Sequence, residues 1–178
     1  MEISNKKAQV LCDENKLFEI AKTLGEKLTK DYEGKNLLVV SILKGALYFT
    51  SDLTKKIDIP LKLDVVITSS YGNETVSSGN VKIVKDIDYD ISDYDVLLVD
   101  DVLDTGNTMK VLIEHFKEKH PKSIKSCVLF NKQDRRKVDL KADYVGMEVP
   151  DYFLVGYGLD YAETYRNLPY VTILTGEE

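Results

Sequence analysis

Apolar and polar residues follow two patterns along the chain, which predict helices and strands in turn. Apolar residues recur at helical spacing from about Lys16 to Lys30 and over about Ala46–Lys56. The other apolar runs suit strands; they are Leu37–Leu43, the alternating stretch Leu61–Thr68, Val81–Lys85, Val96–Asp100, Ile124–Phe130, Tyr144–Val149, Phe153–Val155 and Val171–Leu174. Strands that alternate with helices in this way favour an α/β fold.

One segment interrupts the pattern between two predicted strands. Residues 69–80 are polar, contain glycine and include Ser70 and Tyr71. A loop of this length inside a compact domain is usually functional or mobile. We therefore expect a mobile functional loop here, and an exposed hairpin loop is the alternative.

The most informative segment is Val96–Met109, where a strand, a polar loop and a helix follow one another. Its four apolar residues Val96–Val99 suit a strand that is covered on both faces, as in parallel sheets. The apolar residues after the loop lie at helical spacing, namely Met109, Leu112, Ile113 and Phe116. The backbone N–H groups of residues 106–109 and the hydroxyls of Thr105 and Thr108 would then point beyond the carboxyl edge of the sheet, where they suit a phosphate.

Three acids in the same segment complicate this interpretation, because carboxylates repel a phosphate unless they bind something else. They are Asp100, Asp101 and Asp104. Ribose hydroxyls and a magnesium ion would resolve the conflict. No lysine follows Gly106, so the loop is not the Walker loop of nucleoside triphosphatases. The segment therefore predicts a site for a phosphorylated sugar.

Composition and charge narrow the class of protein. The chain has 178 residues with 43% hydrophobic and 30% charged residues, which is typical of one globular domain over 1–178. The net charge of −6 disfavours a general nucleic-acid surface. The sequence contains no apolar run of membrane-spanning length, and the first seven residues lack the apolar core of a signal peptide. We expect a cytoplasmic protein with no membrane partner.

Four separated blocks carry a resemblance to a known family. The acidic segment resembles the phosphoribosyl-diphosphate signature of type I phosphoribosyltransferases. Together with three further blocks it makes nearly the whole chain similar to the bacterial hypoxanthine-guanine branch of that family; these blocks are residues 41–46 (SILKGA), 69–72 (SSYG) and 149–161 (VPDYFLVGYGLDY). The resemblance implies a type I phosphoribosyltransferase fold, with a mostly parallel central sheet flanked by helices and a small hood formed by the chain ends. The segment from about 142 to 178 would contribute to that hood over the base.

The resemblance also implies an activity. It is purine salvage, in which the phosphoribosyl group of 5-phosphoribosyl 1-diphosphate moves to N9 of hypoxanthine or guanine and gives IMP or GMP plus pyrophosphate. The implied cofactor is Mg²⁺, and the implied assembly is a homodimer or homotetramer. The loop at 69–80 would be the lid that closes over the diphosphate and excludes water.

Roles for the residues of the acidic segment follow from the same match. Asp104 matches the catalytic acid and would accept the purine proton; capping the helix is the alternative. Asp100 and Asp101 match the acidic pair for ribose hydroxyls and metal, although Asp100 replaces the commoner glutamate, so that a water or magnesium ion would make up the shorter reach. The 5′-phosphate loop comprises Thr105, Gly106, Asn107 and Thr108.

The remaining matches concern pyrophosphate and the base. Lys44 and Gly45 match the pyrophosphate loop, whose peptide bond before the lysine is cis in the family, Arg166 matches a pyrophosphate-binding arginine and Asp160 a further magnesium ligand. Lysine donates but cannot accept hydrogen bonds, so Lys132 suits O6 of a 6-oxopurine and opposes the amino group of adenine. Phe153 would stack on the purine, with core packing as its alternative, and Leu154 would bind the base through backbone groups.

Two other functions remain open at this point. A receiver-type magnesium-binding signalling domain also has paired acids after an apolar strand, but in its first strand near the N-terminus. An RNA-binding regulatory protein on a phosphoribosyltransferase scaffold is suggested by a basic cluster of Lys132, Arg135, Arg136 and Lys137. The acidic charge balance counts against RNA binding.

Overall fold

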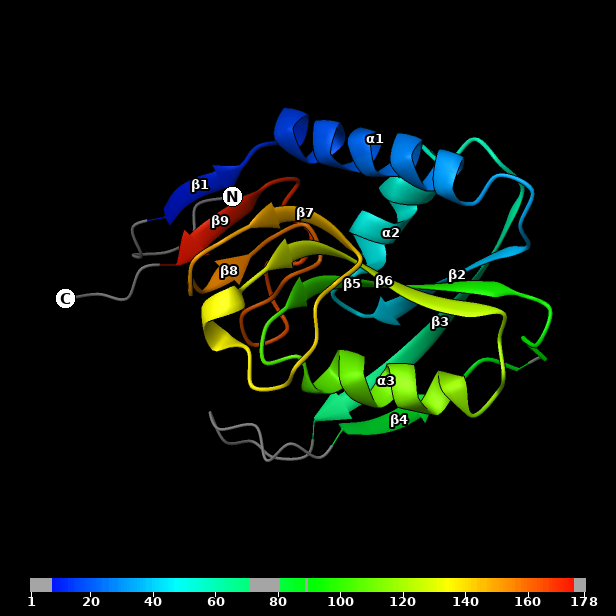
Figure 1. The fold of residues 1–178 in the computed structure, drawn as a ribbon. Helices are drawn as coiled ribbons and strands as arrows, with labels where there is room; N and C mark the ends of the chain where they lie inside the picture. Colours follow the sequence, from blue (N-terminus) through cyan, green and yellow to red (C-terminus); the bar gives the residue numbers. More distant parts are fainter. Residues whose placement is uncertain (1–7, 71–80, 89, 175–178) are drawn as a thin grey trace.

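Two sheets of unequal size organise the fold (Figure 1). The computed structural model describes residues 8–70, 81–88 and 90–174. The larger sheet has six strands, in the spatial order β4 (Val81–Lys85), β3 (Leu61–Ser70), β2 (Leu37–Leu43), β5 (Asp95–Leu103), β6 (Ser123–Asn131) and β7 (Tyr144–Glu148). The smaller sheet has three, in the order β1 (Ala8–Cys12), β9 (Val171–Leu174) and β8 (Leu154–Val155).

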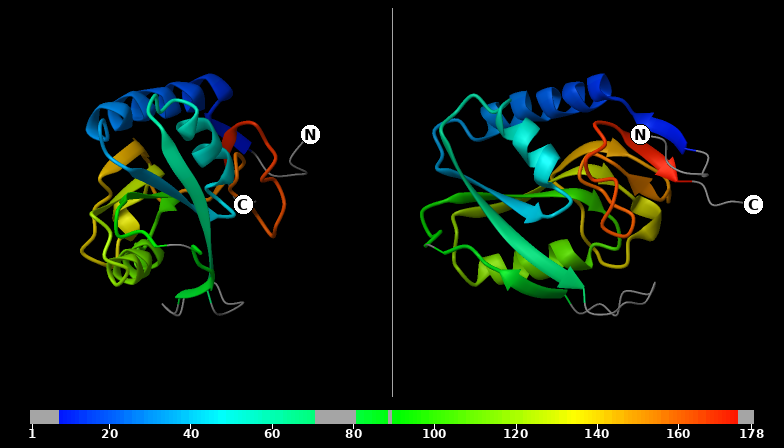
Figure 2. Two further views of the ribbon diagram at one scale, coloured as in Figure 1. Left: turned by 90° about the vertical axis from the view of Figure 1, so that its right-hand side faces the viewer. Right: turned by 180° about the vertical axis from the view of Figure 1, so that it is seen from behind.

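The larger sheet is mostly parallel, and helices cover both of its faces. Only β4 pairs antiparallel with its neighbour; the other pairings are parallel. Helices α1 (Glu14–Asp31) and α2 (Leu47–Thr54) lie on one face, and α3 (Asn107–Lys117) lies on the other (Figures 1 and 2). A short 3₁₀ helix, η1 (Gln133–Arg135), follows β6. The expected α/β fold is confirmed.

Strand β2 shows why a continuous apolar run forms a central strand here. Alternate residues point to opposite faces of a strand, so Leu37 and Val39 pack in the core beneath α1 and α2, while Leu38 and Val40 pack in the core beneath α3. All four side chains are buried. Helix α1 adds its apolar stripe to the first core, and its N-terminus is capped by the side chain of Asp13, which accepts a hydrogen bond from the amide of Lys16 at 2.8 Å.

The small sheet is the hood expected from the chain ends. Strand β9 pairs antiparallel with both β1 and β8. Figure 1 shows this sheet beyond the carboxyl ends of β5, β6 and β7, so it closes over the edge where the polar loops lie. The predicted elements did not include β1. Of the described strands within the segment 142–178, β7 belongs to the larger sheet, and β8 and β9 belong to the sheet of the hood.

The alternating stretch forms strand β3 as predicted; within its apolar row Leu63 is 52% exposed, whereas Val66 is fully buried. Two other element predictions differ from the structure in detail. Strand β5 continues past Val99 through the acid pair to Leu103. Residues 69 and 70 belong to β3, and the rest of the predicted loop, Tyr71 included, lies outside the described residues. No helix in the described part of the chain is long and apolar enough to span a membrane.

Candidate active site

The paired acids lie within β5, where the central strand reaches the hood. Asp100 is buried, and its Oδ1 accepts a hydrogen bond from the amide of Asp101 at 3.0 Å. Oδ1 of Asp101 accepts one from the amide of Val102 at 2.8 Å. Successive side chains of a strand point to opposite faces of the sheet. Side-chain direction alone would therefore not bring the carboxylates of Asp100 and Asp101 into one site.

Burial disturbs the protonation of both carboxyls. Desolvation, followed by repulsion from Asp101, raises the pKa of Asp100 well above its usual range. Desolvation also raises the pKa of Asp101, against the smaller opposing effects of its hydrogen bonds and of the Arg166 guanidinium. A cation would relieve this repulsion. No group of three or more metal-ligating side chains occurs among the described residues. Asp100 and Asp101 supply carboxylate oxygens, the type of ligand that Mg²⁺ prefers.

The predicted phosphate loop between β5 and α3 has the expected strand–loop–helix form. Helix α3 begins with Gly106 as its N-cap at φ 87°, a left-handed conformation that favours glycine. A Cβ at Gly106 would also lie 2.6 Å from Val138. Gly106 and not Asp104 occupies the N-cap position, so the alternative in which Asp104 is the N-cap residue is wrong. The first-turn amides, including those of Asn107 and Thr108, form the N-terminus that suits an anion.

Asp104 precedes this loop and makes a charge contact with the segment after β6. Its Oδ1 lies 3.0 Å from Nε of Arg135. Within the described structure that oxygen is shielded from solvent and accepts no well-aligned hydrogen bond. The side chain as a whole is 39% exposed. The carboxylate therefore remains accessible from one side.

The β2–α2 loop, β5 and the hood meet at the two glycines Gly45 and Gly158. A Cβ at Gly45 would lie 2.0 Å from Oδ2 of Asp101, and a Cβ at Gly158 would lie 2.0 Å from the carbonyl oxygen of Gly45. The peptide bond between Leu43 and Lys44 is cis, as the resemblance implied. This close approach brings Lys44, Gly45 and Asp101 together at the carboxyl edge of the sheet.

Positive and negative side chains of the hood surround this contact. Arg166 donates to the carbonyl oxygen of Gly158 at 2.7 Å and pairs with Asp160 at 2.8 Å. Its Nε is buried and has no hydrogen-bond partner within the described residues. The ammonium of Lys44 pairs with Glu163 at 2.7 Å. Two cations from distant parts of the sequence, each paired with an acidic side chain, thus lie near the contact between Gly45 and Gly158.

The predicted base residues lie at the other side of the site, between β6 and β8. Lys132 is only 9% exposed, and its ammonium donates to the carbonyl oxygen of Tyr152 at 2.6 Å. Phe153 is 52% exposed and packs edge-on against Tyr161, with ring centroids 5.8 Å apart. The alternative that Phe153 is a core residue is therefore wrong. Leu154 is buried in β8.

Known proteins resemble this chain in sequence and in fold. The model of the phosphoribosyl transferase domain family matches residues 9–162. The chain belongs to the phosphoribosyltransferase family. It is 50% identical over 166 residues to a hypoxanthine-guanine phosphoribosyltransferase of Bacillus subtilis, covering 93% of this chain and 92% of that protein. A crystal structure of a hypoxanthine phosphoribosyltransferase from Staphylococcus aureus matches with a TM-score of 0.91 and 45% identity over 98% of this chain and 97% of that one.

A similar protein outside the bacteria supports the same fold assignment. A Trypanosoma cruzi hypoxanthine phosphoribosyl transferase, studied for the role of its C-terminal region in oligomeric state and activity, matches with a TM-score of 0.90 and 32% identity. The match covers 98% of this chain and 94% of that one. The type I phosphoribosyltransferase fold, with its mostly parallel sheet and small hood, is therefore confirmed.

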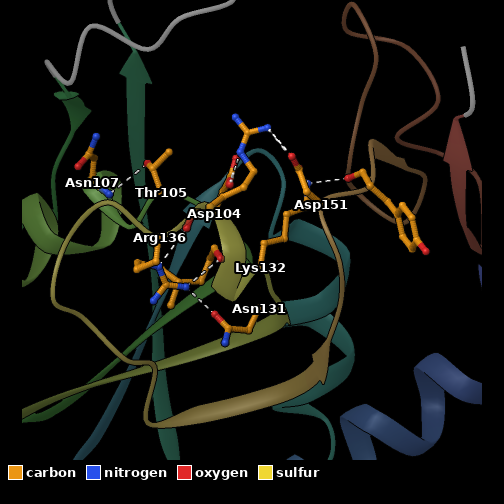
Figure 3. A network of polar contacts seen from close by, with 10 residues as sticks. Asp104, Thr105, Asn107, Asn131, Lys132, Arg136 and Asp151 are labelled. Atoms are coloured by element: carbon orange, nitrogen blue, oxygen red, sulfur yellow. Dashed lines mark hydrogen bonds and ion pairs between the residues drawn. The ribbon is translucent and has the colours of Figure 1, made fainter.

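The basic cluster of this phosphoribosyltransferase is not an open RNA-binding surface. The guanidinium of Arg136 donates to the carbonyl oxygens of Leu103 at 3.1 Å and Asp104 at 3.0 Å, and to Oδ1 of Asn131 at 2.6 Å (Figure 3). It also donates to the carbonyl oxygen of Leu140. Neither the RNA-binding nor the receiver interpretation is supported. The inward direction of the Arg136 side chain could not be predicted from the sequence, because a buried and an exposed arginine look alike in a run of charged residues.

Replacing Arg136 by alanine is expected to lower the free energy of unfolding by about 2–3 kcal/mol, because several carbonyl and amide oxygens lose their hydrogen-bond donor. Urea unfolding followed by circular dichroism measures the change. Lys137→Ala, at an exposed neighbouring position, is the control and should change the stability by less than about 0.5 kcal/mol. Equal stability of the two variants would contradict the structural role of Arg136.

Proposed function

We propose that this phosphoribosyltransferase makes IMP or GMP for purine salvage. It transfers the phosphoribosyl group of 5-phosphoribosyl 1-diphosphate to N9 of hypoxanthine or guanine and releases pyrophosphate. The observation that carries the proposal is the meeting of Asp104, the N-terminus of α3 and Lys132 at the carboxyl ends of β5 and β6. The names of the similar proteins point to the same activity.

On the ribose side of the site, the phosphate loop binds the substrate and Asp104 accepts a proton. Amides at the start of α3, with the hydroxyls of Thr105 and Thr108, bind the 5′-phosphate. Asp104 accepts the proton that leaves the purine as the new bond to N9 forms. Its accessible carboxylate, at the mouth of the loop, supports this role.

The acid pair and the Lys44–Gly45 loop act on the diphosphate side. Asp100 and Asp101 would hold Mg²⁺ and the ribose hydroxyls, and Asp160 would supply a further carboxylate for the metal. When bound, Mg²⁺ neutralises charge on the pyrophosphate. Arg166 adds a permanent positive charge, and its unpartnered buried Nε in the described structure is a free donor for a phosphate oxygen.

Base recognition rests on Lys132 and on the loop before β8. The ammonium of Lys132 donates to O6 of the purine after it leaves the carbonyl oxygen of Tyr152. The exposed ring of Phe153 stacks on the base, and Leu154 contributes backbone groups. The loop at 69–80, with Ser70 and Tyr71, serves as the lid in this proposal. A homodimer or homotetramer in the cytoplasm, with no nucleic-acid partner, completes it.

Hypoxanthine and guanine are expected to be substrates, and adenine is not. Adenine would set its amino group against the ammonium of Lys132 and leave a buried charge without an acceptor. Lys132→Ala should raise KM or lower kcat so that kcat/KM for both oxopurines falls by roughly 10–100-fold, with a much smaller effect on the KM for phosphoribosyl diphosphate. Nucleotide formation from each base measures this.

Lys141→Ala, at an exposed position outside the site, is the matched control and should behave as the wild type. Use of adenine at the rate of hypoxanthine would refute the recognition of O6. Unchanged oxopurine kinetics in Lys132→Ala would refute only the role of that lysine, whereas no nucleotide from any purine would overturn the proposed function.

A further inference from the structure

We infer that Arg135 is a positioning residue that joins the proton-accepting carboxylate of Asp104 to the purine-binding loop. The inference deepens the proposed function and rests on it. Nothing in the sequence separated Arg135 from the other basic residues of its cluster. The structure places it between the two halves of the site.

Arg135 contacts one carboxylate on each side. It stands at the end of η1, three residues after Lys132, and its backbone amide donates to the carbonyl oxygen of Lys132 at 3.3 Å. Its Nε lies 3.0 Å from Oδ1 of Asp104, and its Nη1 lies 3.2 Å from both carboxylate oxygens of Asp151. Asp104 and Asp151, both labelled in Figure 3, come from different segments of the chain and pair with this one guanidinium group.

The contact with Asp104 leaves the reactive side of that carboxylate open. Oδ1, the oxygen near Arg135, is shielded from solvent. The side chain nevertheless is 39% exposed, so its accessible polar surface belongs to Oδ2. Arg135 therefore holds the buried oxygen by charge and leaves the other oxygen to accept a proton. If Arg135 instead blocked the carboxylate, it would contact Oδ2 and leave Oδ1 accessible.

The contact with Asp151 reaches the base side of the site. Asp151 directly precedes Tyr152, whose carbonyl oxygen accepts the hydrogen bond of Lys132 at 2.6 Å. The ammonium of Lys132 also lies 3.7 Å from Oδ1 of Asp151. A guanidinium is a rigid planar fork, so Arg135 sets the distance between the proton acceptor and the loop that binds the purine.

The side chains of Arg135, Asp104 and Asp151 are partly exposed. An effect on the geometry of the site can therefore be measured separately from an effect on folding stability. Ion pairs with this degree of exposure contribute little to folding. A loss of activity in an Arg135 variant without a loss of stability would therefore come from the geometry of the site. A displacement of about 1 Å in a reacting group can lower a rate by up to about 10²-fold.

The test is a double-mutant cycle in the full-length protein, with hypoxanthine and phosphoribosyl diphosphate as substrates. We expect Arg135→Gln to lower kcat by roughly tenfold and Asp151→Asn to lower it by roughly threefold, because the second change frees only one end of the fork. The kcat of the double variant should be at most about twofold lower than that of Arg135→Gln. The KM for phosphoribosyl diphosphate should change by less than about threefold in every variant.

Two controls make the outcomes distinguishable. Lys137→Gln removes the same charge from an exposed neighbouring position and should retain wild-type kcat. The thermal midpoint of Arg135→Gln should lie within about 3 °C of the wild type. The inference is overturned if Arg135→Gln keeps kcat within about twofold, if the effects of the single changes multiply in the double variant, or if the loss of kcat follows a larger fall in the midpoint. An inactive wild-type protein would instead overturn the proposed function.

Discussion

Asp104→Asn is expected to lower kcat by about 10²–10⁴-fold, the range typical of a lost general base. The amide has nearly the shape of the carboxylate but cannot accept the purine proton. The side chain is partly exposed and makes no well-aligned hydrogen bond through Oδ1 within the described residues. The fold should therefore tolerate the change. Steady-state rates of IMP formation and the binding of IMP by calorimetry measure the two effects separately.

Nucleotide binding should remain largely intact in this variant, because the phosphate loop and Lys132 are unchanged. Asp139→Asn, at an exposed position of the segment after η1, is the matched control and should retain full activity. A kcat for Asp104→Asn within about threefold of the wild type would reject the assignment of Asp104 as the general base.

Removal of divalent cations is expected to abolish phosphoribosyl transfer, and addition of Mg²⁺ is expected to restore it. Departure of pyrophosphate needs its charge to be neutralised. Desolvation and repulsion from Asp101 raise the pKa of Asp100, and a bound cation would relieve that repulsion. Activity measured during titration with a chelator and then with Mg²⁺ tests the expectation. Full activity in excess chelator would remove the metal from the proposal.

The role of Asp160 can be measured in the same titration. Asp160→Ala should raise the Mg²⁺ concentration for half-maximal activity by roughly tenfold, because Asp160 stands beside Arg166 at 2.8 Å on the pyrophosphate side. Asp58→Ala, at an exposed position between α2 and β3, is the control and should leave the requirement unchanged. An unchanged requirement in Asp160→Ala would show that this carboxylate does not support the metal.

The pattern of apolar residues predicted helices and strands correctly where a strand is buried on both faces or where a helix has one apolar face. Strand β2 lies at the predicted bounds, and α1 and α3 follow their apolar spacing. The same approach predicted strand β3 but not which of its side chains are covered, since Leu63 in its apolar row is exposed. This strand lies next to the edge strand β4, where neighbouring elements rather than its own alternation decide which side is covered.

In the candidate site, too, features formed by neighbouring residues could be predicted from the sequence more directly than contacts between distant segments. Its acidic strand, its glycine-bearing phosphate loop and the following helix are contiguous in the chain, so residue types and spacing alone predicted them. The predicted roles of Lys132 in base recognition and of Arg166 in pyrophosphate binding came from the family resemblance. Their placement in the structure agrees with those roles, which remain predictions.

The sequence by itself determined the α/β class, the phosphate loop and its acids, because these depend on residues that are neighbours along the chain. Only the tertiary structure decided that β1 completes the hood, that a Cβ at Gly45 would meet Asp101, and that Arg135 joins Asp104 to Asp151. Each of these features depends on segments that are distant in sequence. The surroundings of a glycine and the direction of an arginine side chain depend on the segments that folding brings next to them. Composition and periodicity do not show which segments these are.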